Sequence, residues 1–180
     1  MNYNTLFNGI SRFYIGKNLC CLSGQADDIE SVIRGNAMPM LFVLQGEVDV
    51  EFRTGRGCIK QGHFAVIASA DVIGLCINAS AVVFVFYPSK RLKFYFRLAS
   101  ESFKLSISET LPIMPPLQQW IDMQLEQSGD NCAPTGIEEW QRCSELVRIL
   151  LAYPRNAIET LFIPLFACSM GSCKNCRSST

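Results

Sequence analysis

The sequence that predicts the fold lies between residues 40 and 88 and contains Leu41-Phe42-Val43-Leu44-Gln45-Gly46-Glu47-Val48-Asp49-Val50-Glu51-Phe52. The first four residues of this stretch are all apolar. After Gly46, apolar and acidic residues alternate, as they do in a strand with one buried face. Turns at residues 54–57 and 60–63 then separate further apolar strands at 64–67, 72–77 and 81–87. Short strands separated by turns predict a small antiparallel β-barrel or sandwich.

The sequence after these strands predicts helices. The first begins at Pro115, because proline is tolerated in the first turn of a helix, and ends at Gly129. The second begins at Thr135 and Glu138, whose spacing is that of a capping box. A third begins at Pro154. The predicted fold class is therefore α+β, with a small antiparallel barrel or sandwich followed by a helical annex of about three helices.

The same patterns predict how the chain is divided. We expect the barrel in residues 1–88, the helical annex in residues 89–168 and a flexible Cys-containing tail in residues 169–180. Basic and aromatic residues at 90–98 have helical spacing. We interpret them as a short amphipathic helix lying over the barrel, with a nucleic-acid-binding patch as the alternative.

The charge composition gives no support for a function that depends on the overall charge of the protein. The 180 residues include 16 Lys and Arg and 16 Asp and Glu, for a formal net charge of zero. This balance gives no reason to expect binding to nucleic acid or to an anionic membrane. No apolar run reaches the ~20 residues that span a bilayer, and the N-terminus lacks the features of a secretory signal. The expected location is the cytoplasm.

Nine cysteines and one histidine limit the possible chemistry. In a reducing compartment a buried cysteine behaves as a small apolar residue. Cys168, Cys173 and Cys176 have a spacing that suits two or three metal ligands or a redox site, but no second such pair exists to complete a four-ligand site. Metal-dependent oxygenases and isomerases built on small barrels need several imidazoles. We therefore expect no metal, no cofactor and no catalytic residues, and the sequence favours binding over catalysis.

Two sets of residues are candidates for binding. A small-molecule site needs an apolar cavity with a few polar groups, and the candidate polar groups in the barrel are Tyr14, Arg53, His63 and Cys76. Ordinary packing and solvation of the barrel rim is the interpretation that the sequence favours for the same residues, with ligand contact as the alternative. The second helix carries more apolar surface than one contact requires, which predicts a dimer interface formed by Leu146, Val147, Ile149, Leu150 and Leu151. The alternative is a helix buried between the barrel and the third helix.

Several segments together resemble a known family. Residues 41–48 are similar to the signature strand of the N-terminal cupin-like domain of AraC/XylS-type transcriptional regulators, and residues 59–67 are similar to the turn and strand that follow it. The order of barrel and then helices also matches, and residues 145–154 with 162–166 resemble the connection to the DNA-binding domain in one subgroup.

The resemblance implies a cupin-like domain that senses an effector or a protein partner and forms a homodimer. DNA contact in this family belongs to two helix-turn-helix units, which are absent from this chain. Two alternatives remain open: a stand-alone cupin small-molecule-binding protein or enzyme, and a truncated anti-activator that forms mixed dimers with full-length regulators.

Overall fold

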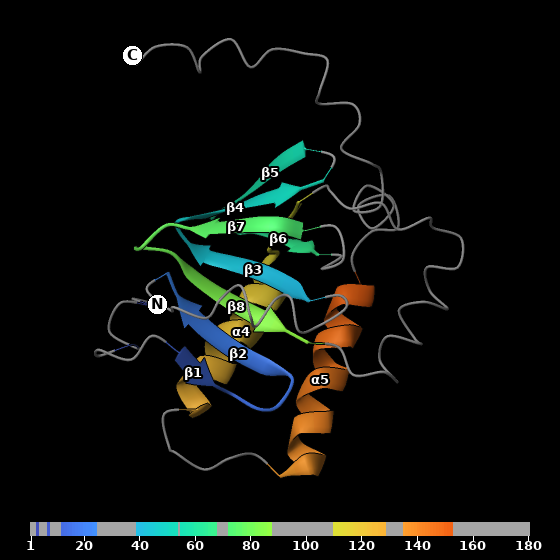
Figure 1. Ribbon diagram of the computed structural model, residues 1–180. Helices are drawn as coiled ribbons and strands as arrows, with labels where there is room; N and C mark the ends of the chain where they lie inside the picture. The colour runs from blue at the N-terminus through green and yellow to red at the C-terminus, as the bar shows by residue number, and fades with distance from the viewer. Residues whose placement is uncertain are drawn as a thin grey trace, which may run out of the picture.

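The computed structural model describes residues 3, 7, 12–24, 39–53, 55–67, 72–87, 110–128 and 135–152, which form two antiparallel sheets and two helices (Figure 1). The larger sheet contains, in spatial order, β1 (Arg12–Tyr14), β2 (Leu19–Ser23), β8 (Val82–Phe86), β3 (Met40–Gln45), β6 (His63–Val66) and β9 (Leu111–Pro112). The smaller sheet contains β5 (Gly55–Lys60), β4 (Glu47–Phe52) and β7 (Val72–Ile77). The helices are α4 (Pro115–Gln127) and α5 (Gly136–Leu151).

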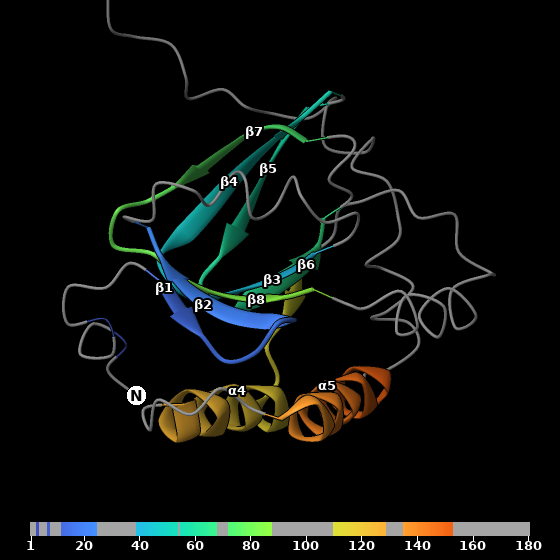
Figure 2. The ribbon, with the colours of Figure 1, turned by 60° about the horizontal axis from the view of Figure 1, so that its bottom comes forward.

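The described elements form three layers. The three-stranded sheet covers one face of the six-stranded sheet, and α4 and α5 cover the other face (Figure 2). The two apolar clusters that result lie on opposite sides of the six-stranded sheet. The predicted α+β class is thereby confirmed.

The position of β3 in the middle layer explains its apolar sequence. Leu41 and Val43 face the three-stranded sheet, whereas Phe42 and Leu44 face the helices, and all four are buried. Because successive side chains point to opposite faces, a strand covered on both faces needs apolar residues throughout.

Strand β4 forms the middle of the outer sheet and alternates as predicted. Val48 and Val50 are buried against the six-stranded sheet, and Glu47 and Asp49 are exposed on the other face. The change from continuous to alternating apolar residues at Gly46 therefore marks the point where the chain leaves the central sheet for the outer one.

The described residues do not form a closed barrel. Three connections join the two sheets at one end: Gly46 between β3 and β4, residues 61–62 between β5 and β6, and residues 78–81 between β7 and β8. From this joined end the sheets diverge toward a far end, where β8 ends near Tyr87 (Figure 2). No described strand pairs with strands of both sheets, so the hydrogen-bonded ladder does not continue around a barrel.

The two helices begin as the sequence predicts. Pro115 and Pro116 open α4, and Thr135 forms a capping box with Glu138 at the start of α5. The third predicted helix, the helix expected at 90–98 and the Cys-containing tail all lie outside the described residues. Neither α4 nor α5 is long and apolar enough to cross a membrane, and these are the helices of the described segments.

Candidate functional site

The four residues predicted to supply polar groups to a small-molecule site do not lie at one place in the fold. Arg53 is exposed in the turn that follows β4, at the far end of the sandwich. His63 begins β6 at the joined end, and its Nδ1 lies 3.1 Å from the carbonyl oxygen of Gln61. Cys76 is exposed on the outer face of the three-stranded sheet, opposite Asp49. Tyr14 belongs to β1, and its side chain lies outside the described residues.

The space between the two sheets is lined by apolar side chains, with few polar groups near the far end. The cluster that fills it includes Leu41, Val50 and Val85, all buried. At the far end the thiol of Cys20 donates to the hydroxyl oxygen of Tyr87, with Sγ and Oη 3.8 Å apart. Tyr87 directly follows β8 and packs against this cluster. The buried side chains of this cluster pack between the sheets as a core, and Cys20 and Tyr87 place polar groups at its far end.

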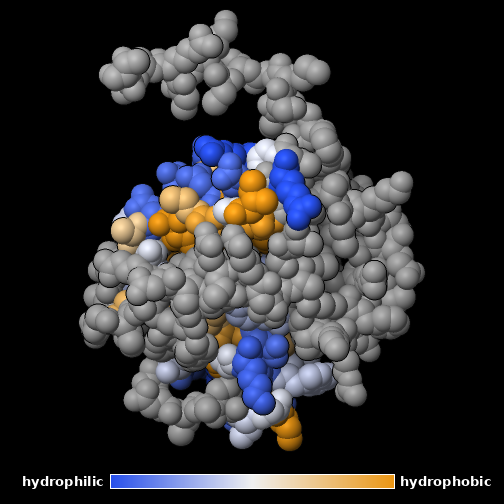
Figure 3. Space-filling view, viewed as in Figure 1, coloured by the Kyte–Doolittle hydropathy of each residue, from blue (hydrophilic) through white to orange (hydrophobic). Residues whose placement is uncertain are grey.

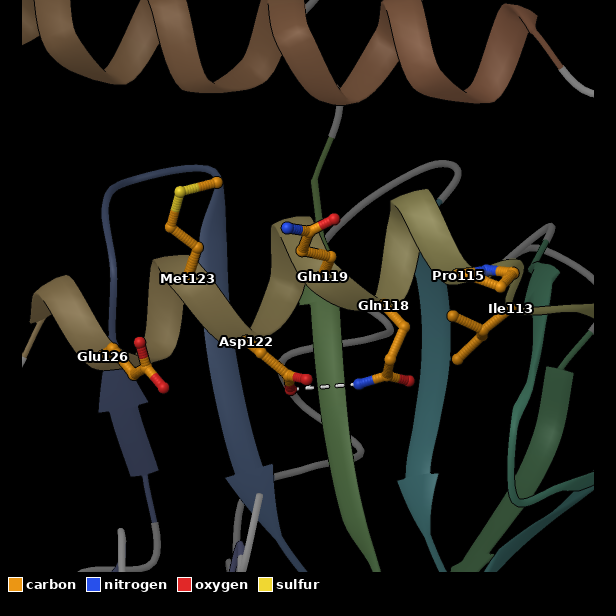
Figure 4. A pocket seen from close by; sticks show the side chains of 7 residues that line it. All are labelled: Ile113, Pro115, Gln118, Gln119, Asp122, Met123 and Glu126. Atoms are coloured by element: carbon orange, nitrogen blue, oxygen red, sulfur yellow. Dashed lines mark hydrogen bonds between the residues drawn. The ribbon is translucent and has the colours of Figure 1, made fainter.

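A shallow groove of about 710 Å³ runs along the outer side of α4 (Figure 4). In this view Gln118 and Asp122 point to one side of the helix, and Gln119 and Met123 point to the other. The groove is lined by Ile113, Pro115, Gln118, Gln119, Asp122, Met123 and Glu126.

Two polar side chains of this groove, Gln118 and Asp122, have hydrogen-bond partners within the chain. The hydroxyl of Tyr3 donates to Asp122 Oδ1 at 2.8 Å, and the side-chain amide of Gln118 donates to the same oxygen at 3.0 Å and to the Tyr3 oxygen at 2.6 Å. Burial, followed by the hydrogen bond to Asp122, raises the pKa of the Tyr3 phenol above its usual range. The network therefore fixes Tyr3 to α4, and no periodic pattern in the sequence indicated this contact.

Most of the residues predicted to form a dimer interface pack against other parts of the same chain. Leu146 is fully buried, and Val147 and Leu150 are 9% and 5% exposed in the cluster between the helices and the six-stranded sheet. Ile149 is half-buried against the same cluster, and the side chain of Leu151 lies outside the described residues. This burial against the chain's own strands agrees with one side of the alternative, a helix buried between the barrel and the third helix, and the third helix lies outside the described residues.

Other apolar residues are exposed on the helical layer. Ile137 and Trp140, one turn apart in α5, are 73% and 65% exposed. Met114 and Met123, at the start and on the outer side of α4, are each 40% exposed. The remaining exposed large apolar residue of the described segments is Ile73, in the three-stranded sheet. On the face shown in Figure 3, hydrophilic and hydrophobic surface lie side by side over that sheet.

The outer face of the three-stranded sheet places cysteines beside carboxylates. Asp49 of β4 lies between Cys58 of β5 and Cys76 of β7 in the strand register. The Cys58 thiol donates to Glu47 Oε2 at 3.8 Å. Partial burial, together with the carboxylates of Asp49 and Glu47, raises the pKa of Cys58 to about 11, so this thiol stays protonated and weakly nucleophilic at neutral pH. No group of metal-binding side chains is found among the residues that the structure describes.

Glu139 has a role that the sequence did not reveal. Its neighbour Glu138 caps α5, as the capping-box spacing predicts. Glu139 is instead only 8% exposed, and its Oε1 accepts hydrogen bonds from the backbone nitrogen and the side-chain amide of Asn18, at 2.7 and 3.2 Å. These partners are 121 residues apart in the chain, which is why local spacing could not indicate the contact.

Comparison with known proteins adds no relative: no protein-family model matches this chain, and no curated protein matches it. The functional interpretation therefore depends on the sequence patterns and the geometry described above.

Proposed function

We propose that this chain is the effector-sensing and self-association part of an AraC-type transcriptional regulator, acting through a DNA-binding domain outside this chain. The proposal includes a cupin-like sandwich as the sensing part and a third helix after Pro154. In this proposal an effector binds between the two sheets at their far end, where Tyr87 and Cys20 supply polar groups. A binding role is favoured over catalysis, because the single histidine of the chain is too few for the metal centre of a cupin enzyme.

The proposed self-association is supported by the distribution of exposed apolar side chains. Four of the five large exposed ones in the described segments lie on the helical layer: Met114, Met123, Ile137 and Trp140. Large exposed apolar side chains that gather on one layer favour a contact with another protein. The helical layer is also the side of the six-stranded sheet away from the sandwich interior, so a second copy bound there leaves the space between the sheets accessible to an effector.

Light scattering with size-exclusion chromatography tests the self-association. We expect the unmodified chain to be a dimer and the double variant Ile137→Glu and Trp140→Glu to be a folded monomer, because both side chains are exposed and their loss opens no cavity. Ile73→Glu is the matched control, since Ile73 is 50% exposed but lies on the three-stranded sheet, and it should remain a dimer. A monomeric unmodified chain, or equal effects of the two changes, contradicts the proposed surface.

A reporter assay tests the regulatory role. We expect the chain, fused to a DNA-binding domain that represses a promoter only as a dimer, to restore repression, and the Ile137→Glu and Trp140→Glu variant to fail. The alternative of a stand-alone metal-dependent cupin enzyme predicts stoichiometric iron, manganese or nickel in the purified protein. Finding such a metal by elemental analysis would replace the regulator proposal with the enzyme.

A further inference from the structure

Asn18 contacts both the sandwich and the helical layer. It lies in the turn between β1 and β2, at the far end of the sheets. Its carbonyl oxygen accepts a hydrogen bond from the backbone nitrogen of Tyr87 at 2.7 Å. Its own backbone nitrogen and side-chain amide both donate to Glu139 of α5. One residue thus joins the end of β8 to the first turns of α5, and we call this set of hydrogen bonds the Asn18 latch.

The latch is closely packed as well as hydrogen-bonded. A Cβ atom on Gly16, in the same turn, would lie 2.9 Å from Glu139 Oε1, so a larger residue there would require the carboxylate to move. Cys143, one helical turn after Glu139, is buried, and burial together with the Glu139 carboxylate raises its pKa to about 12. Hydrogen bonds to a buried carboxylate are among the stronger ones in a protein.

The two sides of the latch have different neighbours. On the sandwich side, Tyr87 also accepts the thiol proton of Cys20 in the space between the sheets. On the helix side, Glu139 lies between Ile137 and Trp140, the two most exposed large apolar residues of the described segments. Farther along α5, Leu146 and Leu150 hold the helix to the six-stranded sheet through apolar contacts of their own.

We propose that the Asn18 latch couples the far end of the sandwich to the first turns of α5. With the latch closed, the start of α5 is fixed against the turn between β1 and β2. A displacement of Tyr87 opens the latch and frees this end of the helix, and with it Ile137 and Trp140, while Leu146 and Leu150 keep the rest of α5 in place. The use of this coupling to transmit effector binding to self-association rests on the proposed function, whereas the coupling itself does not.

Hydrogen–deuterium exchange on the full chain tests the helix side of the latch. Asn18→Asp places a carboxylate against that of Glu139, so the backbone amides of residues 140–143 should exchange about tenfold faster or more. Adding Glu139→Gln to that variant supplies an amide donor for the new carboxylate and should restore slow exchange. Lys17→Ala, at an exposed neighbouring position, is the control and should change nothing in α5. Equal acceleration in α4 and α5, or no rescue by the double change, overturns the proposal.

A second variant tests the sandwich side. Tyr87→Pro removes the backbone N–H that donates to the Asn18 carbonyl oxygen and should speed exchange of the same α5 amides severalfold, less than Asn18→Asp does. A change confined to β2 and β8 would show that Tyr87 and α5 are not coupled, and would overturn the proposal even if the helix-side result holds. A monomeric chain in light scattering with these exchange results unchanged would contradict the proposed function and leave the latch intact.

Discussion

The indole ring of Trp120 in α4 meets the phenyl ring of Phe84 in β8 edge to face, with ring centroids 6.0 Å apart and an interplanar angle of 83°. Phe84 is also edge to face with Phe42 of β3, and Phe42 stacks on Phe64 of β6. The Trp120 Nε1 donates to Glu145 Oε2 of α5 at 3.2 Å. One tryptophan therefore connects the middle of the six-stranded sheet to both helices.

Removing this side chain should destabilise the whole described fold. Trp120→Ala empties a fully buried position and should lower the free energy of unfolding by about 3–5 kcal/mol. Trp140→Ala is the matched control, because the chain has two tryptophans and Trp140 is 65% exposed. That change should stay within about 0.5 kcal/mol in a monomeric sample. Urea unfolding followed by circular dichroism measures both, and similar losses would contradict the assigned burial.

The capping box at the start of α5 predicts a smaller effect. Thr135 Oγ1 accepts from the backbone nitrogen of Glu138 at 3.3 Å, and Glu138 Oε2 accepts from the backbone nitrogen of Thr135 at 2.8 Å. Thr135→Ala should cost about 1 kcal/mol of unfolding free energy, whereas Thr135→Ser keeps the hydroxyl and should cost much less. The same urea titrations compare the two variants, and equal losses would show that the hydroxyl is not the stabilising group.

The capping box also gives a pH dependence. The hydrogen bond from Thr135 lowers the pKa of the Glu138 carboxyl below its usual range. A carboxyl whose pKa is lower in the folded state stabilises it above its unfolded pKa, and this contribution is lost as the pH falls. The stability difference between unmodified chain and Glu138→Gln should therefore shrink on acidification. A difference that grows toward low pH in thermal unfolding would contradict this sign.

Gly46 is required by both its backbone conformation and its surroundings. Its φ of 72° is in the left-handed region, and a Cβ atom there would lie 2.9 Å from the Cα of Ala81. Gly62 has a similar φ of 75° but no atom within 4 Å of the corresponding position. Gly62→Ala should cost about 1–2 kcal/mol for the backbone strain alone. Gly46→Ala should cost roughly 1 kcal/mol more, because the backbone of residue 81 must also move. Denaturant unfolding of the two variants makes the comparison, and equal costs would contradict the close approach.

The raised pKa of Cys58 predicts slow alkylation at neutral pH. Because the thiolate is the reactive form, the rate at Cys58 should rise about tenfold per pH unit and level off near pH 11. Asp49→Asn removes a neighbouring negative charge, which favours the thiolate, so the plateau should shift to lower pH. Peptide mass spectrometry after timed iodoacetamide treatment separates Cys58 from the other cysteines. Asp122→Asn, on α4, is the control, and an equal shift there would contradict a local effect of Asp49.

The sequence determined the features that depend on neighbours along the chain. The alternation of Val48 and Val50 with acidic residues identified β4, and the spacing of Thr135 and Glu138 identified the start of α5. These predictions succeeded because strand pleating and helix capping involve residues two to four positions apart.

The tertiary structure alone decided which surfaces are covered. The apolar side chains of Leu146 and Leu150 were consistent with either a dimer interface or a core, and packing on the six-stranded sheet places them in the core. Glu139 looks like its neighbour Glu138 in the sequence, yet it bonds Asn18 across 121 positions. Burial and long-range hydrogen bonds are set by how whole layers pack, and no periodicity within a single segment contains that information.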